Sequence, residues 1–404
     1  MKIANYREKG SVLGSILLIA GSCVGAGMLG LPVSTAMGGF QPSVVMFFVC
    51  WLFMMVSSLF LLEVNLYFKK EVNLITMADK TLGRVGQFAT WVLFLFLFYS
   101  LMVSYSAGSG ELVADFVEEF TGFAIARSLG SIIAVSLFGV VIYYGTFAVD
   151  QLNRILMVGL IVTFFMLLYF GAPSVNKKLL NHVNWFDSIW ALPVMVISFG
   201  YHNLVPSLTT YLEFNAKRMR ISIIIGSAIP LVGYILWEWL ILGLIPYDNF
   251  LGALDQGNMV THTLRQVVGK SWVVEVAQYF AFFAIVTSFI GVALSFVDFL
   301  ADGFGIEKNR RGSFLLCCMA LGPPLFFALL YPSLFIVALK YAGGFGANIL
   351  FGVLPALMVW SGRYYHKLWD EEQVPGGKVT LALITFFAVA IFGVQLVNAL
   401  YFNR

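Results

Sequence analysis

Eleven long apolar segments dominate this sequence, and a bilayer-spanning helix needs roughly 20 mostly apolar residues. Only 11% of the residues are charged, against about 25% in a typical soluble domain, so the chain cannot cover itself with a polar surface. The segments also lack the period-two alternation of barrel strands. We therefore predict an all-α integral membrane protein, a single polytopic domain over residues 1–404. Its membrane segments lie at about residues 11–37, 42–66, 88–115, 129–147, 152–171, 188–210, 221–245, 271–302, 312–330, 333–360 and 379–402.

Basic residues are distributed unevenly between the two sides of the predicted membrane. Most of the 24 Lys and Arg residues fall on the side of the N-terminus, and Lys340 lies within a segment. The basic residues on the other side are Arg127, Lys177, Lys178, Arg265, Lys270 and Arg404. The positive-inside rule then predicts a cytoplasmic N-terminus and a C-terminus on the outer side. The net charge of +3 reflects this asymmetry and does not indicate a nucleic-acid partner.

The stretch "GSCVGAGMLGLP" at residues 21–32 places four glycines and a proline inside the first apolar segment. A nucleotide-binding loop would need a preceding strand, and here the glycines lie within a membrane run. Two readings stay open. Gly21 and Gly25 have the GxxxG spacing that lets helices pack closely, or the glycines mark an unwound helix that a ligand touches.

A second interruption, "SFGYHNLVP" at residues 198–206, lies in the sixth segment. The two interruptions lie five segments apart in chain order, in the first and the sixth segment, so the two broken helices run in opposite directions. Such a pair is the best sequence pointer to an inverted-repeat transporter with its site near the midplane. We predict repeats at about 11–171 and 188–360, with an added helix at 379–402. An amino acid and a cation would satisfy the backbone groups that unwinding exposes.

Several motifs together resemble those of the hydroxy/aromatic amino acid permeases, within the amino acid–polyamine–organocation superfamily. The likeness is strongest to bacterial tyrosine and tryptophan permeases and covers nearly the whole chain. It implies a LeuT-type fold, secondary active uptake of an aromatic amino acid across the bacterial cytoplasmic membrane, proton symport and no cofactor. The motifs are "IAGSCVGAGMLGLP" (19–32), "LGRVGQ" (82–87), "SAGSGELVADF" (106–116), "SFGYHNLVPSL" (198–208), "GSAIPLVGYILW" (226–237), residues 286–302 and "YPSLFIVALKYAGG" (331–344).

The two interruptions supply most of the predicted substrate site. Aromatic rings near them would provide faces for stacking, since an aromatic substrate needs an apolar cavity with one polar partner. Tyr105 is a further aromatic candidate, although most single aromatic residues in such a chain face lipid. The predicted substrate-binding residues are Cys23, Gly25, Ala26, Gly27, Tyr99, Ser198, Phe199, Gly200, Tyr201 and His202.

Two coupling ions remain possible. Ala284, Thr287 and Ser288 fall at i, i+3 and i+4 on one helical face, and with the carbonyls of Gly21 and Val24 they resemble a sodium site of hard oxygen ligands. Sodium is the only metal that we expect. Back-bonding to the preceding turn is the structural alternative for the two hydroxyls.

A proton would instead need a titratable carrier. His202, the only histidine within a predicted segment, is a candidate because histidine titrates in the useful range. The alternative is a neutral side chain that satisfies loose backbone groups.

Charged residues inside the predicted segments are expensive and default to functional hypotheses. Lys340 lies about 10 Å beyond the start of its segment at the 1.5 Å rise of a helix, and we predict that it pairs with Glu111 in an outer gate. Glu238 is the less favoured partner, and snorkelling of the lysine is the alternative. Glu63 and Asp298 lie near the cytoplasmic ends, where we expect interfacial water to reach them.

Other classes of membrane protein fit the sequence less well. It contains no HExxH motif, nucleophile elbow or inward-facing carboxylate cluster that a membrane enzyme would need. A channel would show a ring of pore-lining residues and would not need two matched breaks. We therefore predict a proton-coupled symporter for tyrosine, tryptophan or both, with a sodium-coupled neutral amino acid symporter that uses Thr287 and Ser288 as the alternative.

Overall fold

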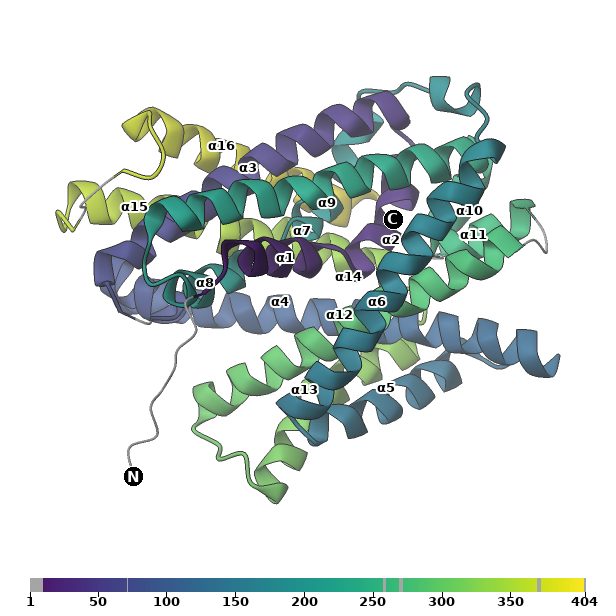
Figure 1. Cartoon of the computed structure of the whole chain (residues 1–404), viewed down its shortest axis with the longest axis horizontal. Coiled ribbons are helices and arrows are strands. Elements are labelled where there is room, and N and C mark those ends of the chain that lie inside the picture. Colours follow the sequence, from purple (N-terminus) through teal and green to yellow (C-terminus); the bar gives the residue numbers. More distant parts are fainter. Residues whose placement is uncertain (1–9, 71, 257–258, 269–271, 369–371, 403–404) are drawn as a thin grey trace.

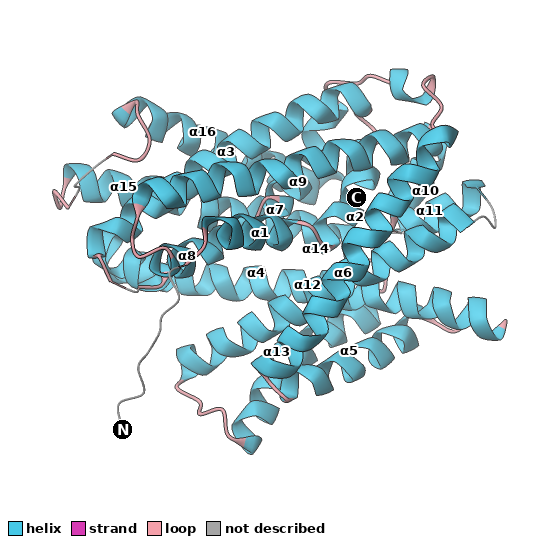
Figure 2. Ribbon diagram, viewed as in Figure 1, coloured by secondary structure: helices cyan, strands magenta, loops and turns pink. Residues whose placement is uncertain are grey.

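The computed structural model describes residues 10–70, 72–256, 259–268, 272–368 and 372–402, and every regular element in these ranges is helical (Figure 2). Five basic residues of the charge count lie outside the described ranges: Lys2, Arg7, Lys9, Lys270 and Arg404.

The α-helices are α1 (Val12–Cys23), α2 (Ala26–Thr35), α3 (Phe40–Phe68), α4 (Leu74–Thr121), α5 (Arg127–Tyr143), α6 (Thr146–Gly171), α7 (Leu192–Ser198), α8 (Val205–Tyr211), α9 (Ala216–Leu244), α10 (Tyr247–Gln256), α11 (Val260–Val268), α12 (Trp272–Phe304), α13 (Arg310–Leu330), α14 (Phe335–Tyr341), α15 (Leu354–Tyr364) and α16 (Gly377–Val397). Four short 3-10 turns join them: η1 (Ala172–Ser174), η2 (Leu179–Asn181), η3 (Asp187–Ala191) and η4 (His202–Leu204). Two segments are π-helical, η5 (Ala342–Val353) and η6 (Asn398–Phe402).

The described helices confirm the predicted all-helical membrane architecture. Nine helical segments are long and apolar enough to cross a bilayer, among them the composite segments Asp187–Tyr211 (η3 to α8) and Phe335–Tyr364 (α14 to α15), and the bent pair α1–α2 makes a tenth. Helix α5, an apolar helix of 17 residues, is shorter but overlaps the predicted segment at 129–147. Helix α4 extends beyond the predicted segment 88–115 at both ends, but its backbone is non-helical at Gly83, so residues 74–82 form a separate short helix, capped by the Asn73 side chain, which accepts from the Thr76 amide.

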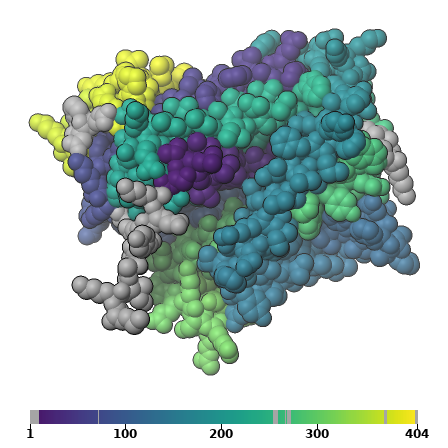
Figure 3. All heavy atoms as spheres, viewed as in Figure 1, coloured from purple at the N-terminus to yellow at the C-terminus, as the bar shows by residue number. Residues whose placement is uncertain are grey.

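Helix α9 borders the first span along its length. It packs against α1, α2 and α3, while α6 crosses α12 and α4 lies against α5, α12 and α13 (Figure 1). The space-filling view shows α1, in purple, at the surface beside the teal atoms of α9 (Figure 3). Leu13, Leu17 and Leu18 are exposed on α1. An apolar surface of this kind suits contact with lipid chains.

Both predicted interruptions are present. Helices α1 and α2 meet at an angle of 51° around Val24 and Gly25. In the sixth span α7 ends at Ser198, and the chain resumes helical form through η4 and α8. The breaks therefore divide both spans into half-helices inside the bundle.

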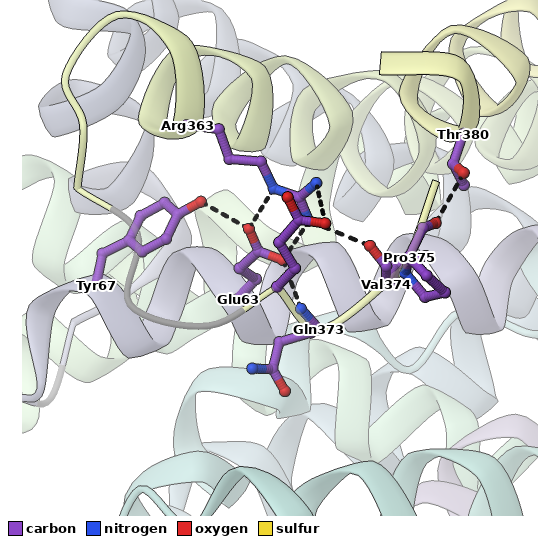
Figure 4. Close-up of polar contacts among 8 residues, drawn as sticks. Glu63, Tyr67, Arg363, Gln373, Val374, Pro375 and Thr380 are labelled. Carbon is purple, nitrogen blue, oxygen red and sulfur yellow. Dashed lines mark hydrogen bonds and ion pairs between the residues drawn. The ribbon is translucent and has the colours of Figure 1, made fainter. Parts of the chain in front are cut away.

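Glu63, expected at interfacial water, is instead fully buried in an ion pair near the predicted cytoplasmic end (Figure 4). The Arg363 guanidinium contacts both carboxylate oxygens at 2.7 Å. The Tyr67 hydroxyl and the backbone amide of Gln373 donate to the same carboxylate at 2.9 and 2.8 Å. The expectation failed because Arg363 lies 300 residues away in the sequence, and a buried carboxylate is tolerated when such partners satisfy it.

Replacing Arg363 with Met should destabilise the protein strongly. The change leaves the Glu63 carboxylate buried without its cation, at a cost of about 3–5 kcal/mol. Thermal unfolding of the detergent-solubilised protein measures the effect. The exposed pair between Lys308 and Asp298 is the control, since Asp298→Asn should cost less than about 1 kcal/mol. Equal melting shifts for Arg363→Met and Asp298→Asn would contradict this account.

Candidate functional site

The break in the first span exposes the start of α2. Val24 closes α1 by donating its amide to the Ala20 carbonyl at 3.2 Å, and Gly25 then adopts an extended conformation. Gly25 is the N-cap residue of α2 and, as a glycine, has no side chain that could accept a hydrogen bond from the first amides of the helix. The Ala26 amide donates to the Ser288 hydroxyl at 3.0 Å. The positive end of the α2 dipole therefore lies within the bundle, where it favours a negative group.

The second break is a short irregular segment. The Ser198 hydroxyl donates back to the Val194 carbonyl at 2.8 Å, and Phe199 and Gly200 close the last turn of α7. The Ser198 side chain lies against the first break, because a Cβ added to Gly27 would stand 2.9 Å from its hydroxyl oxygen. The two interruptions, about 170 residues apart in the sequence, thus meet in space.

Tyr234 of α9 connects the two breaks. Its hydroxyl oxygen lies 2.7 Å from the Cys23 carbonyl and 2.6 Å from the Ser198 carbonyl, the last residues of α1 and α7. A phenol has one hydrogen to donate, so it satisfies only one of these carbonyls at a time. The two carbonyl oxygens converge but share a single hydrogen between them, so together they are suited to bind a cation or an ammonium group.

Trp237, one turn further along α9, compensates a second backbone defect. Pro32 has no amide hydrogen, so the Met28 carbonyl four residues earlier lacks its helical donor. The Trp237 indole donates to that carbonyl at 3.0 Å. Sequence analysis missed both α9 residues, although the proline at i+4 from Met28 was a signal that an outside donor would be required.

The predicted aromatic residues do not all lie at the breaks. Phe199 is buried and packs edge-to-face on Tyr234 at 5.1 Å between ring centroids. The Tyr201 hydroxyl is 2.8 Å from the Ser58 hydroxyl in α3. Tyr99 points to α12 and α13, where its hydroxyl donates to the Met319 carbonyl at 3.0 Å and its ring packs on that of Phe296.

His202 lies fully buried at the start of η4. Its ring stacks on Phe351 of η5 at 4.8 Å and 10°. The backbone of Met54 is close, but neither ring nitrogen makes a hydrogen bond of ordinary geometry to a described residue. The structure therefore places His202 between the second break and the π-helical part of the tenth span.

The candidate sodium ligands lie beside the first break. A Cβ built on Gly25 would clash with the Ser288 hydroxyl and stand 3.6 Å from the Ala284 carbonyl. The Thr287 hydroxyl bonds back to the Phe283 and Ala284 carbonyls at 2.7 and 3.1 Å. These contacts bring α12 to the first break, while the Thr287 hydroxyl has the back-bonded arrangement common in membrane helices.

Glu111 has partners other than the predicted Lys340. Its carboxylate accepts from the Met259 amide at 3.1 Å and lies 3.7 Å from the Arg127 guanidinium. Lys340 is buried in α14. The Glu111–Lys340 gate stays a prediction.

Residues 8–395 match the model of the tryptophan/tyrosine permease family. The chain is 33% identical to "Tyrosine-specific transport system 1" of Haemophilus influenzae, over 94% of this chain and 95% of that protein. A "Tryptophan-specific transport protein" of the same organism is 30% identical, over 94% of each chain.

Two solved transporters share the fold. A complex of MhsT with L-phenylalanine gives a TM-score of 0.63 at 14% identity, covering 96% of this chain and 98% of the other. Mhp1, a nucleobase-cation-symport-1 family transporter with bromovinylhydantoin bound, gives 0.60 at 13% identity, with 100% and 94% covered. The predicted LeuT-type architecture is thereby confirmed.

Gly25→Val and Gly27→Val should each abolish transport while leaving membrane insertion intact. Gly25 has no room for a side chain beside Ser288, and Gly27 has little beside Ser198. A branched side chain would also keep a ligand away from the backbone. Radiolabelled uptake, normalised to the inserted protein, measures the effect. Gly291→Val is the matched control, since nothing lies within 4 Å of its Cβ position; near-normal uptake by both test variants would contradict the assignment.

Proposed function

Because this chain belongs to the tryptophan/tyrosine permease family, we propose that it imports tyrosine, tryptophan or both by proton symport. Like its relatives, the protein is a multi-pass membrane transporter and not an enzyme. The observation that carries the proposal is the convergence of the Cys23 and Ser198 carbonyls next to the N-terminal end of α2. We further propose that the N-terminus is cytoplasmic and the C-terminus lies outside, in a bacterial cytoplasmic membrane.

The geometry of the breaks suits the two charged groups of an amino acid. The carboxylate binds at the amides of Gly25 and Gly27, and at the Ala26 amide in place of the Ser288 hydroxyl, where the helix dipole stabilises negative charge. The ammonium group, with three donors, replaces the single hydrogen of the Tyr234 hydroxyl at Cys23 and Ser198. Backbone recognition of both groups leaves the side chain free to determine specificity.

An aromatic side chain is favoured by the rings that surround the breaks. Phe199 and Phe47 pack on Tyr234 with centroids 5.1 and 6.0 Å away. Edge-to-face and offset arrangements contribute about 0.5–1.5 kcal/mol each beyond buried area. On the side of the second break, the proposed substrate site is completed by Gly200, Tyr201 and His202.

The coupling ion is proposed from two sets of residues. A proton is favoured because the Thr287 hydroxyl already bonds to its own helix, which weakens the case for a sodium ligand. Sodium remains the second candidate because Ser288 and the Ala284 carbonyl lie directly at Gly25, where the carbonyls of Gly21 and Val24 would complete an oxygen site.

Uptake into proteoliposomes, with proton and sodium gradients imposed separately, tests the proposal. We expect tyrosine or tryptophan to accumulate under an inward proton gradient without sodium, and preloaded substrate to accelerate entry by counterflow. Transport of neither amino acid would overturn the proposed function. Accumulation driven by sodium alone would replace the proton with sodium as the coupling ion.

The double variant Thr287→Ala/Ser288→Ala separates the two ions further. Under proton coupling, the variant should still transport, with the same pH profile, because the Thr287 hydroxyl only bonds back to its own helix. Under sodium coupling it loses two ligands and with them transport or its sodium dependence. Uptake measured at several sodium concentrations distinguishes these results.

A further inference from the structure

Glu238 of α9 is a buried carboxyl group that the site described above does not use. Its side chain is inaccessible to solvent, and its contact among the described residues is the Thr35 hydroxyl, 2.9 Å from Oε2. The other oxygen, Oε1, has no hydrogen-bond partner in this part of the chain. Glu63 shows the alternative, a buried glutamate with a bidentate arginine. An ionised carboxylate without such partners is expensive to bury.

Hydrogen-bond accounting at Thr35 indicates which form of Glu238 the structure holds. The Thr35 hydroxyl oxygen lies 2.9 Å from both the Leu31 carbonyl and Glu238 Oε2. Its single hydrogen reaches only one of these acceptors. If Glu238 is protonated at Oε2, the carboxyl donates to Thr35 and Thr35 donates to Leu31, so both short contacts are satisfied. If Glu238 is ionised, one of the two contacts has no hydrogen.

No other titratable side chain interacts with this carboxyl among the described residues. The elements that pack on α9 are α1, α2, α3, α6, α8, α11, η1 and η2, and α2, η1 and η2 carry none. The titratable groups of the others are Cys23, Cys50, Glu63, Tyr67, Asp150, Arg154, Tyr169, Tyr211, His262 and Arg265, and α9 itself adds Lys217, Arg218, Arg220 and Tyr234. None of these makes a hydrogen bond or ion pair with Glu238.

A small hollow lies one helical turn beyond the carboxyl. Its lining includes Ala36, next to Thr35, and Leu242, one turn after Glu238. His182 and Tyr247 line the same hollow, and the His182 ring is 3.0 Å from the Met37 carbonyl. The hollow has a volume of about 10 Å³, about enough for one water molecule. Glu238 itself does not line this hollow, which begins one turn of α9 beyond it, at Leu242.

The same face of α9 joins Glu238 to the first break. Tyr234, Trp237 and Glu238 are spaced i, i+3 and i+4, and hence point to one side of the helix. They contact the Cys23 carbonyl, the Met28 carbonyl and the Thr35 hydroxyl in turn. These three contacts extend from the end of α1 to the end of α2. A ligand that displaces the Tyr234 hydroxyl from Cys23 therefore acts on the same face of α9 that carries Glu238.

We propose that Glu238 carries the coupled proton, bound at Oε2 while Thr35 accepts its hydrogen bond and released when α2 moves relative to α9. This inference rests on the proposed proton symport. It assigns the proton to α9 and not to His202, whose ring is stacked away from this face on Phe351. The proton enters and leaves the carboxyl as a single acid–base step, without a co-reactant.

E238Q tests the proposal in proteoliposomes. Glutamine keeps the size and a hydrogen-bond donor for Thr35 but cannot titrate. We expect counterflow within about threefold of the original protein, whereas accumulation under an inward proton gradient falls to an internal-to-external ratio of about 1. E238D, which keeps a titratable group, should still accumulate with a displaced pH profile. Asp298→Asn removes an exposed carboxyl as the control and should accumulate normally.

Other outcomes overturn the inference in distinguishable ways. Proton-driven accumulation by E238Q at the original level removes Glu238 as carrier and leaves the proposed function standing. An original protein that exchanges substrate without responding to a proton gradient overturns both proton symport and the inference. If E238Q is inactive in both assays, infrared difference spectra between low and high pH decide the question. A protonated-carboxyl band whose position differs between the original protein and E238D supports the proposal. An identical band in the two proteins overturns it.

Discussion

Backbone carbonyls that lose their helical donors inside a bilayer must find other donors, because lipid offers none. This requirement organises the centre of the molecule. Two spans are broken, and the last carbonyls of α1 and α7 converge on the Tyr234 hydroxyl. A third carbonyl, at Met28, is freed by Pro32 and satisfied by Trp237. Helix α9 thus supplies the donors that allow the first span to unwind, and the remaining deficit at Cys23 and Ser198 is where a ligand can bind.

The two buried glutamates show how the same side chain serves different purposes. Glu63 is held by Arg363, Tyr67 and Gln373, so its charge is compensated and the pair fastens α3 to α15 and the segment after it. Among the described residues, Glu238 has one hydroxyl as its hydrogen-bond partner and no cation. The first arrangement resists any change of protonation, whereas the second is satisfied best by a neutral acid. A group that holds a proton and has no fixed counter-ion is suited to exchanging it.

The spans and their two interruptions were predictable from the sequence, because apolar length and the glycines at 21–32 and 198–206 are local signals. The meeting of the two breaks followed from the opposite directions of their spans. The contacts that complete the site were not predictable, since Tyr234 and Trp237 reach carbonyls more than 200 residues away. The direction in which Tyr99 points, towards α12 and α13, was not predictable either, because a helical aromatic residue shows its facing direction only when its neighbours are known. The Glu63 expectation failed for the same reason.

The most direct test of the central claim compares binding of L-tyrosine and L-tryptophan to the purified protein with binding of their analogues that lack the carboxylate or the amino group. If the N-terminal end of α2 and the carbonyls of Cys23 and Ser198 recognise these groups, each analogue loses charge-assisted hydrogen bonds worth about 1.5–3 kcal/mol. The expected loss of affinity is therefore about 10- to 100-fold for each analogue. An analogue without its amino group that binds as tightly as the amino acid would contradict the role of the two carbonyls.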